Sequence, residues 1–85
     1  MQTVYILQCA DGTFYTGCTS ALEDRLSRHN AGYVEYTKSR LPVELVFSCA
    51  FKSQVKAYEF EKYLKSGSGI AFRNKHLIQP SEASA

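Results

Sequence analysis

Long hydrophobic runs are absent from this sequence of 85 residues, whose apolar runs extend over only a few residues each. A helix that crosses a bilayer needs about 20 consecutive apolar residues, so we expect no transmembrane segment. No stretch has the pattern of a secretory signal peptide either. The sequence therefore predicts a protein without membrane contact whose default location is the cytoplasm.

Cysteine is scarce as well, with Cys9, Cys18 and Cys49 as the three examples. An odd number of cysteines without CxxC spacing favours neither a disulfide framework nor a zinc site. Free cysteine is usually a small core residue. We expect reduced thiols that are buried on strands.

A strong excess of one charge is also missing, because the formal net charge is +2 and the sequence pI is near 8.5. Dedicated nucleic-acid binders are often more basic. The basic residues nevertheless fall mainly in two spans, 25–40 and 62–76. If these spans meet in space they form a cationic face that can hold phosphates. Without a motif, ordinary solvated surface charge explains them equally well.

The composition that is present, with 45% hydrophobic and 13% aromatic residues, is typical of a folded globular chain. Eighty-five residues suffice for one modest core, so the sequence predicts one domain over residues 1–79. The small, polar residues after Pro80 predict a flexible C-terminal tail over residues 80–85.

Two apolar runs, 3–7 and 13–17, flank the dipeptide Asp11-Gly12, which is a strong hairpin signal. The runs should pair antiparallel and place Tyr5 and Tyr15 on neighbouring strands. The second run ends at a glycine, Gly17. A glycine there indicates a positive φ or the close approach of a bound molecule.

A helix should follow, since Ser20 and Glu23 have the spacing of a capping box and Gly32 is placed to end the helix in a left-handed cap. Four residues of this segment form the stripe that should pack inward: Leu22, Arg25, Leu26 and His29. Half of that stripe is polar. It therefore suits a partly buried pocket wall better than a plain core face.

Residues 33–42 form a loop in which aromatic and basic residues alternate. Such a loop can stack on bases and neutralise phosphates. It can equally be a surface crossover whose tyrosines cover core edges. Residues 45–51 then form a near-continuous apolar run, which predicts a third strand covered on both faces.

The next segment, 53–66, has helical periodicity with Ser53 as the N-cap. Glu61 interrupts its apolar stripe, either as a functional carboxylate or as the partner of Lys65 four residues later. The glycines of residues 67–69 predict a flexible joint. A short last helix should follow over 70–78 and stop at Pro80.

Taken together, these residues resemble the GIY-YIG nucleases, a family named after two tripeptides on adjacent strands. Thr3-Val4-Tyr5 stands in place of G-I-Y, and Tyr15-Thr16-Gly17 in place of Y-I-G. Further along the chain, three residues fall at positions that match the family's arginine, histidine and glutamate: Arg25, His29 and Glu61. The loop 37–40 and the segment 61–65 are similar to the small single-domain bacterial branch. The tyrosines and Gly17 are retained, whereas Thr3 and Thr16 depart from the pattern.

The resemblance implies an α/β (α+β) fold with a small three-stranded antiparallel sheet flanked by helices, in the order β-β-α-β-α-α. It also implies a metal-dependent endonuclease that hydrolyses DNA phosphodiester bonds. In that reading Glu61 binds one Mg²⁺ or Mn²⁺ ion and Arg25 clamps the phosphate. Tyr5, assisted by Tyr15 or His29, orients or deprotonates the attacking water.

We expect these five side chains to converge on one face of the sheet in a shallow positive groove. The candidate DNA contacts are four basic residues: Arg28, Lys38, Arg40 and Arg73. Gly17 and Asn74 are candidates for supporting the site. An alternative is a nucleic-acid binding module that is inactive alone or needs a partner protein, and a third possibility is an interaction domain in which Arg25 and Glu61 form a buried ion pair.

Overall fold

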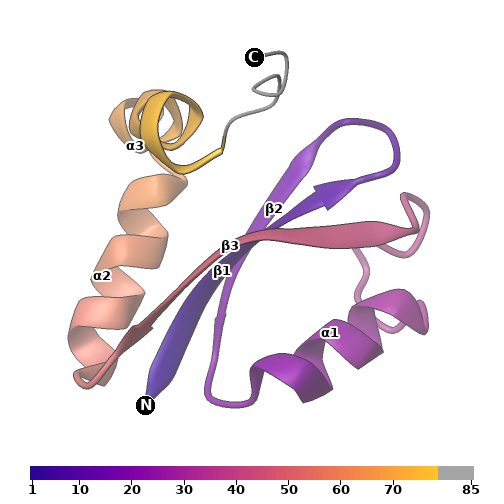
Figure 1. Ribbon diagram of the computed structural model, residues 1–85, viewed down its shortest axis with the longest axis horizontal. Coiled ribbons are helices and arrows are strands. Elements are labelled where there is room, and N and C mark those ends of the chain that lie inside the picture. Colours follow the sequence, from indigo (N-terminus) through magenta and orange to yellow (C-terminus); the bar gives the residue numbers. More distant parts are fainter. Residues whose placement is uncertain (79–85) are drawn as a thin grey trace.

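A computed structural model describes residues 1–78 and confirms the predicted architecture, a three-stranded antiparallel sheet with helices in the order β-β-α-β-α-α (Figure 1). The elements are β1 Gln2–Cys9, β2 Phe14–Thr19, α1 Leu22–Asn30, β3 Val43–Phe51, α2 Gln54–Leu64 and α3 Gly67–Phe72, followed by a π-helical turn over Arg73–Leu77. No helix within residues 1–78 is long and apolar enough to cross a membrane. The predicted tail and the stop at Pro80 lie outside the described residues.

The strand order is β2-β1-β3, so the first strand is the central one. The predicted hairpin is confirmed, with Tyr5 opposite Gly17 and Leu7 opposite Tyr15. Its turn uses Gly12 at φ 89°. Because side chains alternate along a strand, Val4 and Ile6 point to one face of the sheet while Tyr5 and Leu7 point to the other.

The prediction that residues 45–51 are covered on both faces is wrong. β3 is an edge strand, and its Leu45 is 39% exposed. The strand that is buried on both faces is β1, where Val4, Tyr5, Ile6 and Leu7 are all fully buried. Both runs are apolar, so their composition does not reveal which one lies in the centre. The order of the strands across the sheet decides it.

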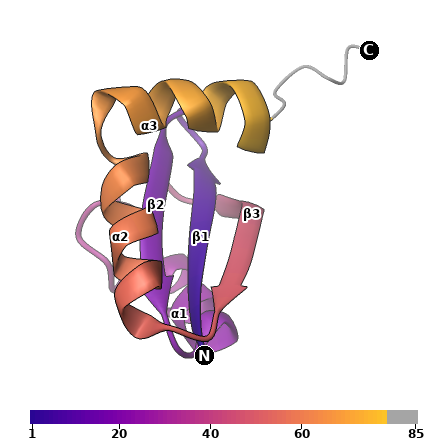
Figure 2. The same cartoon turned by 90° about the vertical axis from the view of Figure 1, so that its left-hand side faces the viewer.

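Helices α2 and α3 cover the face of β1 that carries Val4 and Ile6. Figure 2, viewed from the side of α2, shows α1 behind the sheet. The apolar core between this face and the helices includes Ala57 and Leu64 of α2 and extends to Ile78. The predicted N-cap of α2 is confirmed, since the Ser53 side chain accepts a hydrogen bond from the Lys56 amide.

The predicted flexible joint at residues 67–69 is also wrong, because these residues form the first turn of α3. The hydroxyl of Ser66 caps this turn by accepting from the Gly69 amide at 3.1 Å. A Cβ atom at Gly69 would overlap the carbonyl group of Tyr63. This glycine therefore permits close packing between two helices, and its flexibility is not used.

At the start of α1 the predicted capping box is absent. The N-cap residue is Ala21, without a side-chain capping bond, and the Thr19 hydroxyl accepts from the Ala21 amide instead. The predicted end is confirmed. Gly32 has φ 83°, and the amide of Tyr33 donates to the carbonyl of Arg28 at 3.0 Å, as in a Schellman motif.

The three cysteines are free thiols, as predicted. Cys9 is buried, whereas Cys18 and Cys49 are only half-buried. The difference follows from strand position, because β2 and β3 are the edges of the sheet.

Candidate active site

The face of β1 that α1 covers contains a chain of three fully buried polar groups. The Tyr5 hydroxyl lies 3.1 Å from Nε2 of His29, and Nδ1 of His29 lies 2.8 Å from the hydroxyl of Thr37. The exposed fraction is 0% for all three residues. Tyr5 is positioned by the central strand, His29 by the last turn of α1, and Thr37 by the loop that follows.

One tautomer of His29 satisfies every donor in this chain. The Thr37 hydroxyl can donate to the carbonyl of Val34 at 3.5 Å. Nδ1–H of His29 then donates to Thr37, and Nε2 accepts from Tyr5. In the other tautomer the phenol of Tyr5 has no acceptor among these groups. Since buried donors are almost always paired, we assign the Nδ1–H form.

Burial shifts both titrating groups toward their neutral forms. Desolvation, with a smaller contribution from Tyr15, raises the pKa of Tyr5 to about 12, although Arg25 opposes this shift. Desolvation, assisted by Arg25, lowers the pKa of His29 below its ordinary value. At neutral pH the pair is therefore a neutral phenol that donates to a neutral imidazole.

Tyr15 packs against this pair from the neighbouring strand. Its ring centroid lies 5.0 Å from that of His29 and 6.3 Å from that of Tyr5. Gly17 has a related role, because a Cβ atom there would lie 2.5 Å from the hydroxyl oxygen of Tyr5. The expectation for Gly17 was thus wrong in two respects. The strand continues to Thr19, and the group that approaches closely is the ring of Tyr5 itself.

Arg25 and Glu61 belong to helices that pack against opposite faces of the sheet. Arg25 comes from α1 and Glu61 from α2, and both charges act on the pKa values of Tyr5 and Cys18. Tyr5 and Cys18 point to opposite faces, since Cys18 pairs with Val4. Both charges therefore lie close enough to the sheet to act on groups of both its faces. The prediction that all five residues lie on one face was wrong, because α2 packs on the apolar face.

Glu61 is paired with Lys65, whose Nζ lies 2.9 Å from Oε2, and 22% of the glutamate side chain is exposed. Within residues 1–78, Arg25 forms no ion pair. The buried Arg25–Glu61 pair that the interaction-domain alternative requires is therefore absent. No group of three or more His, Cys, Asp or Glu residues in that range could enclose a metal ion. A single accessible carboxylate fits a magnesium or manganese ion that keeps several waters and takes its other ligands from a substrate phosphate.

A shallow positive groove around the five residues stays a prediction. A groove of about 520 Å³ lies beside the start of α1 and is lined by Arg25 and Arg28, but also by Asp24 and Glu35. Of the five predicted catalytic and metal-binding residues, Arg25 alone lines it.

The candidate DNA contacts differ in how far they are engaged within the fold. Arg28 is exposed and lies over the Tyr33 ring at 6.0 Å, and Lys38 pairs with Glu35 at 3.4 Å across exposed surface. Arg73 lies over the Phe14 ring at 4.8 Å. Asn74, the second supporting candidate, accepts two hydrogen bonds from the Arg73 guanidinium.

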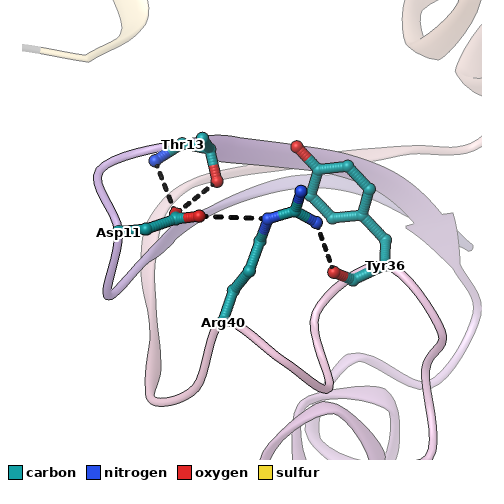
Figure 3. Close-up of polar contacts among 4 residues, drawn as sticks. All are labelled: Asp11, Thr13, Tyr36 and Arg40. Carbon is teal, nitrogen blue, oxygen red and sulfur yellow. Dashed lines mark hydrogen bonds and ion pairs between the residues drawn. The ribbon is translucent and has the colours of Figure 1, made fainter.

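Arg40 is the most engaged of these residues (Figure 3). Its Nε lies 3.1 Å from Oδ2 of Asp11, Nη1 donates to the carbonyl of Tyr36 at 2.7 Å, and the guanidinium lies 4.1 Å from the Tyr36 ring centroid. Hydrogen bonds from Thr13, reinforced by Arg40, hold the pKa of the Asp11 carboxyl below its ordinary value. Its DNA contact stays a prediction, and the structure adds a role that the sequence did not predict: Arg40 ties the loop to the hairpin turn.

Thr37 is the one residue of the buried Tyr5–His29–Thr37 chain for which the sequence predicted no catalytic role. Its position in an aromatic and basic loop suggested surface exposure. Only the fold shows that its hydroxyl is directed at His29.

The site thus combines a tyrosine pair, a histidine and an arginine with one carboxylate from α2 around a central antiparallel sheet. The chain belongs to the GIY-YIG family, since the model of the GIY-YIG catalytic domain matches residues 1–74. A UPF0213 protein of Streptococcus agalactiae is 46% identical over 63 residues, which are 73% of this chain and 72% of that protein. A UPF0213 protein of Natronomonas pharaonis is 47% identical over 64 residues, covering 74% of this chain and 75% of the other.

A solved structure is similar over the whole length. The solution NMR structure of a UPF0213 protein from Bacillus halodurans has a TM-score of 0.61 and 34% sequence identity, and the match covers 100% of this chain and 95% of that one. The small single-domain branch indicated by the sequence is thereby confirmed.

Proposed function

We propose that this protein is a metal-dependent endonuclease that hydrolyses DNA phosphodiester bonds. Membership of the GIY-YIG family supports the class of reaction. The observation that carries the proposal for this chain is the buried hydrogen bond between the Tyr5 hydroxyl and His29 Nε2, with Arg25 acting on both groups.

This hydrogen bond supplies a path for the proton of the attacking water. A phenol with a pKa of about 12 is protonated at neutral pH, so Tyr5 is not present as a phenolate base. The Tyr5 hydroxyl is fully buried and lies beside Arg25, so the path requires the attacking water to enter beside Arg25 with the substrate, where a lone pair of the Tyr5 oxygen accepts its proton. Tyr5 then passes its own proton to Nε2 of His29, so the imidazole is the final acceptor. Tyr15 packs against the imidazole and holds the ring in place.

Arg25 is suited to hold the phosphate oxygens. Its guanidinium is permanently charged, lies beside the Tyr5 hydroxyl, and forms no ion pair with a carboxylate in residues 1–78. The guanidinium can therefore meet the negative charge that develops on the phosphate in the transition state.

Glu61 would hold a Mg²⁺ or Mn²⁺ ion, which fits its single accessible carboxylate. When bound, such an ion polarises the phosphate and stabilises the leaving oxygen. Lys65 would give up its contact with Glu61 and would remain as a neighbouring cation.

A nicking assay with Mg²⁺ or Mn²⁺ on plasmid, branched and single-stranded DNA tests the proposal. Tyr5→Phe removes the hydroxyl and keeps the ring, so we expect cleavage to fall by about 10²- to 10⁴-fold. Tyr58→Phe, on the exposed side of α2, is the matched control and should cut normally. Tyr5→Phe that cuts at the original rate would show that the proton path is wrong. DNA binding without any nicking would favour the alternative, a binding module that is inactive alone or needs a partner protein.

Phosphate contacts by Arg28, Lys38, Arg40 and Arg73 are part of the same proposal. Each change to Ala should weaken binding to all sequences alike and reduce the salt slope by roughly one unit per lost contact. Salt titrations that give unchanged slopes would mean that these are solvated surface charges.

A further inference from the structure

A second pocket, of about 300 Å³, is lined by Tyr15, whose ring also packs against His29. Tyr15 and Tyr36 contribute aromatic rings to it, and Leu64 and Ile70 contribute aliphatic side chains. The cations Lys65 and Arg73 also line it, and no carboxylate does. The proposed function uses Tyr15 to hold His29, Lys65 as the neighbour of Glu61 and Arg73 as a phosphate contact, but it gives the pocket itself no role.

The ring of Tyr36 is held in place by the fold. Arg40 covers it at 4.1 Å, binds the carbonyl of the same residue at 2.7 Å, and is itself anchored to Asp11 (Figure 3). The Tyr15 ring lies 5.5 Å away at an interplanar angle of 41°. Tyr36 is nevertheless 40% exposed. A fixed aromatic ring that remains exposed can stack on a flat ligand at little cost in side-chain entropy.

The position and charge of the pocket indicate what that ligand is. Lys65 lines the pocket and also touches Glu61, at 2.9 Å. The pocket therefore adjoins the carboxylate to which we assign the metal. A DNA strand whose phosphate binds at Glu61 would pass beside Lys65 and therefore beside this pocket. The two cations are complementary to its backbone, and the aromatic rings to its base.

We propose that this pocket binds one nucleobase of the cut strand, next to the scissile phosphate and stacked on Tyr36. Aromatic side chains stack on all four bases, so the pocket recognises a base without reading sequence. This inference rests on the proposed function, because it places the base relative to the scissile phosphate. It adds a base-binding site formed by β2, the loop 33–42, the end of α2, α3 and the turn that follows.

Binding of a mononucleotide to the metal-free protein tests the pocket independently of cleavage. Deoxythymidine 5′-monophosphate should shift the NMR signals of Tyr36, Leu64 and Ile70. Deoxyribose 5-phosphate, which lacks the base, should shift them far less. Equal shifts with both compounds, or nucleotide-induced shifts confined to other surfaces, would overturn the proposal.

Variants of two residues that line the pocket sharpen the test. Tyr36→Ala should weaken nucleotide binding by roughly 5- to 100-fold, as expected for one lost stacking contact, and Tyr36→Phe should preserve binding. Ile70→Glu, at a residue of α3 that lines the pocket, should also weaken it. Tyr33→Ala is the control, because Tyr33 belongs to the same loop, is 73% exposed and lies outside this pocket. Nucleotide binding that survives both Tyr36→Ala and Ile70→Glu would overturn the proposal.

The two proposals fail separately. A protein that never nicks DNA but binds the nucleotide through Tyr36 disproves the nuclease and supports base binding in the pocket. A protein that nicks DNA but shows no base-dependent shifts disproves the pocket and supports the nuclease. A second test measures the cleavage rate of oligonucleotides in which an abasic residue is placed in turn at each position. One position beside the cut should slow wild-type cleavage, and Tyr36→Ala should remove that dependence.

Discussion

The two faces of the sheet are built from the same central strand but from opposite chemistry. On one face, Val4 and Ile6 of β1 pack against Ala57 and Leu64 of α2, with carbon atoms alone in the contact. On the other face, Tyr5 of the same strand begins the buried chain of polar groups that continues through α1 into the following loop. Alternation of side chains along one strand is what separates the two environments.

The comparison shows how a small domain separates stability from chemistry. The apolar face stabilises the folded state by about 25 cal/mol for each Å² of apolar surface that it removes from water. The polar face stabilises little in net terms, because each buried hydrogen bond contributes only about 0.5–1.5 kcal/mol. Its hydrogen bonds instead fix the directions of Tyr5 and His29. Substitutions on the two faces should therefore differ in what they change.

The largest loss of stability is expected on the apolar face. Ile6→Ala creates a cavity at a fully buried position and should lower the free energy of unfolding by about 2–5 kcal/mol, a large part of the total for so small a domain. Urea denaturation measures it. Val55→Ala, at a 64% exposed position of α2, should change stability by less than about 0.5 kcal/mol. Similar effects for the two variants would mean that the core is not where the structure places it.

Gly69→Ala should be the next most destabilising, because its Cβ would overlap the Tyr63 carbonyl where α3 meets α2. We expect about 1–3 kcal/mol from overpacking. Gly67→Ala in the same helix meets no atom within 4 Å and should be neutral or stabilising. Thermal melts of the pair are sufficient. A Gly69→Ala variant as stable as Gly67→Ala would contradict the tight contact between the helices.

On the polar face, Thr37→Val keeps the shape and removes the partner of His29 Nδ1. An unpaired buried donor should cost about 1–3 kcal/mol, and nicking should fall because the imidazole tautomer is no longer fixed. Thr37→Ser keeps the hydroxyl, so it should retain activity despite losing about 1 kcal/mol for a buried methyl group. If Thr37→Val cuts as well as Thr37→Ser, the hydroxyl does not position His29.

The pH dependence of stability distinguishes His29 from the apolar face. Its pKa is depressed in the folded state, chiefly by burial, so the unfolded chain binds the proton more readily. The stability that the folded state gains by keeping His29 neutral is fully present above the unfolded pKa of about 6.5. It is lost as the pH falls from there through the folded pKa. Melts at pH 7.5 and 5.5 should show wild-type stability falling toward acid, and His29→Gln should fall less. An equal fall would exclude His29 as the source.

The smallest change in stability is expected for Glu61→Gln, since an exposed i,i+4 pair with Lys65 contributes only about 0.2–0.5 kcal/mol. Metal-dependent cleavage should nevertheless disappear. Mg²⁺ should raise the melting temperature of the wild type and leave that of the variant unchanged. A variant that melts early, or one that still cuts at the original rate, would show that the glutamate has been assigned the wrong role.

Much of the fold could be predicted because its signals are local. Asp11-Gly12 specifies a hairpin, Gly32 permits the left-handed residue after α1, and Ser53 caps α2. The misassigned segments depended on distant contacts. The flexibility expected for residues 67–69 is overridden by the packing of Gly69 against α2. Ser20 has the sequence spacing of a capping box, but in the structure the N-cap residue is Ala21 and no side chain caps the helix.

The candidate site divides in the same way. Tyr5, Tyr15, Arg25, His29 and Glu61 were found from spacing and from the family resemblance. Spacing on separate elements does not reveal that Glu61 approaches from the other face of the sheet, or that Arg40 is held by Asp11. Those facts depend on which elements become neighbours.

The sequence by itself determined the elements, their order and the residue types available for chemistry, because turns, caps and periodicity depend on residues only a few positions apart. The tertiary structure alone decided that β1 is the central strand, that Thr37 completes the chain of hydrogen bonds through His29, and that Tyr36 faces a pocket beside Glu61. These features join residues 8 to 49 positions apart, and contacts over such distances are set by how the whole chain packs around one core.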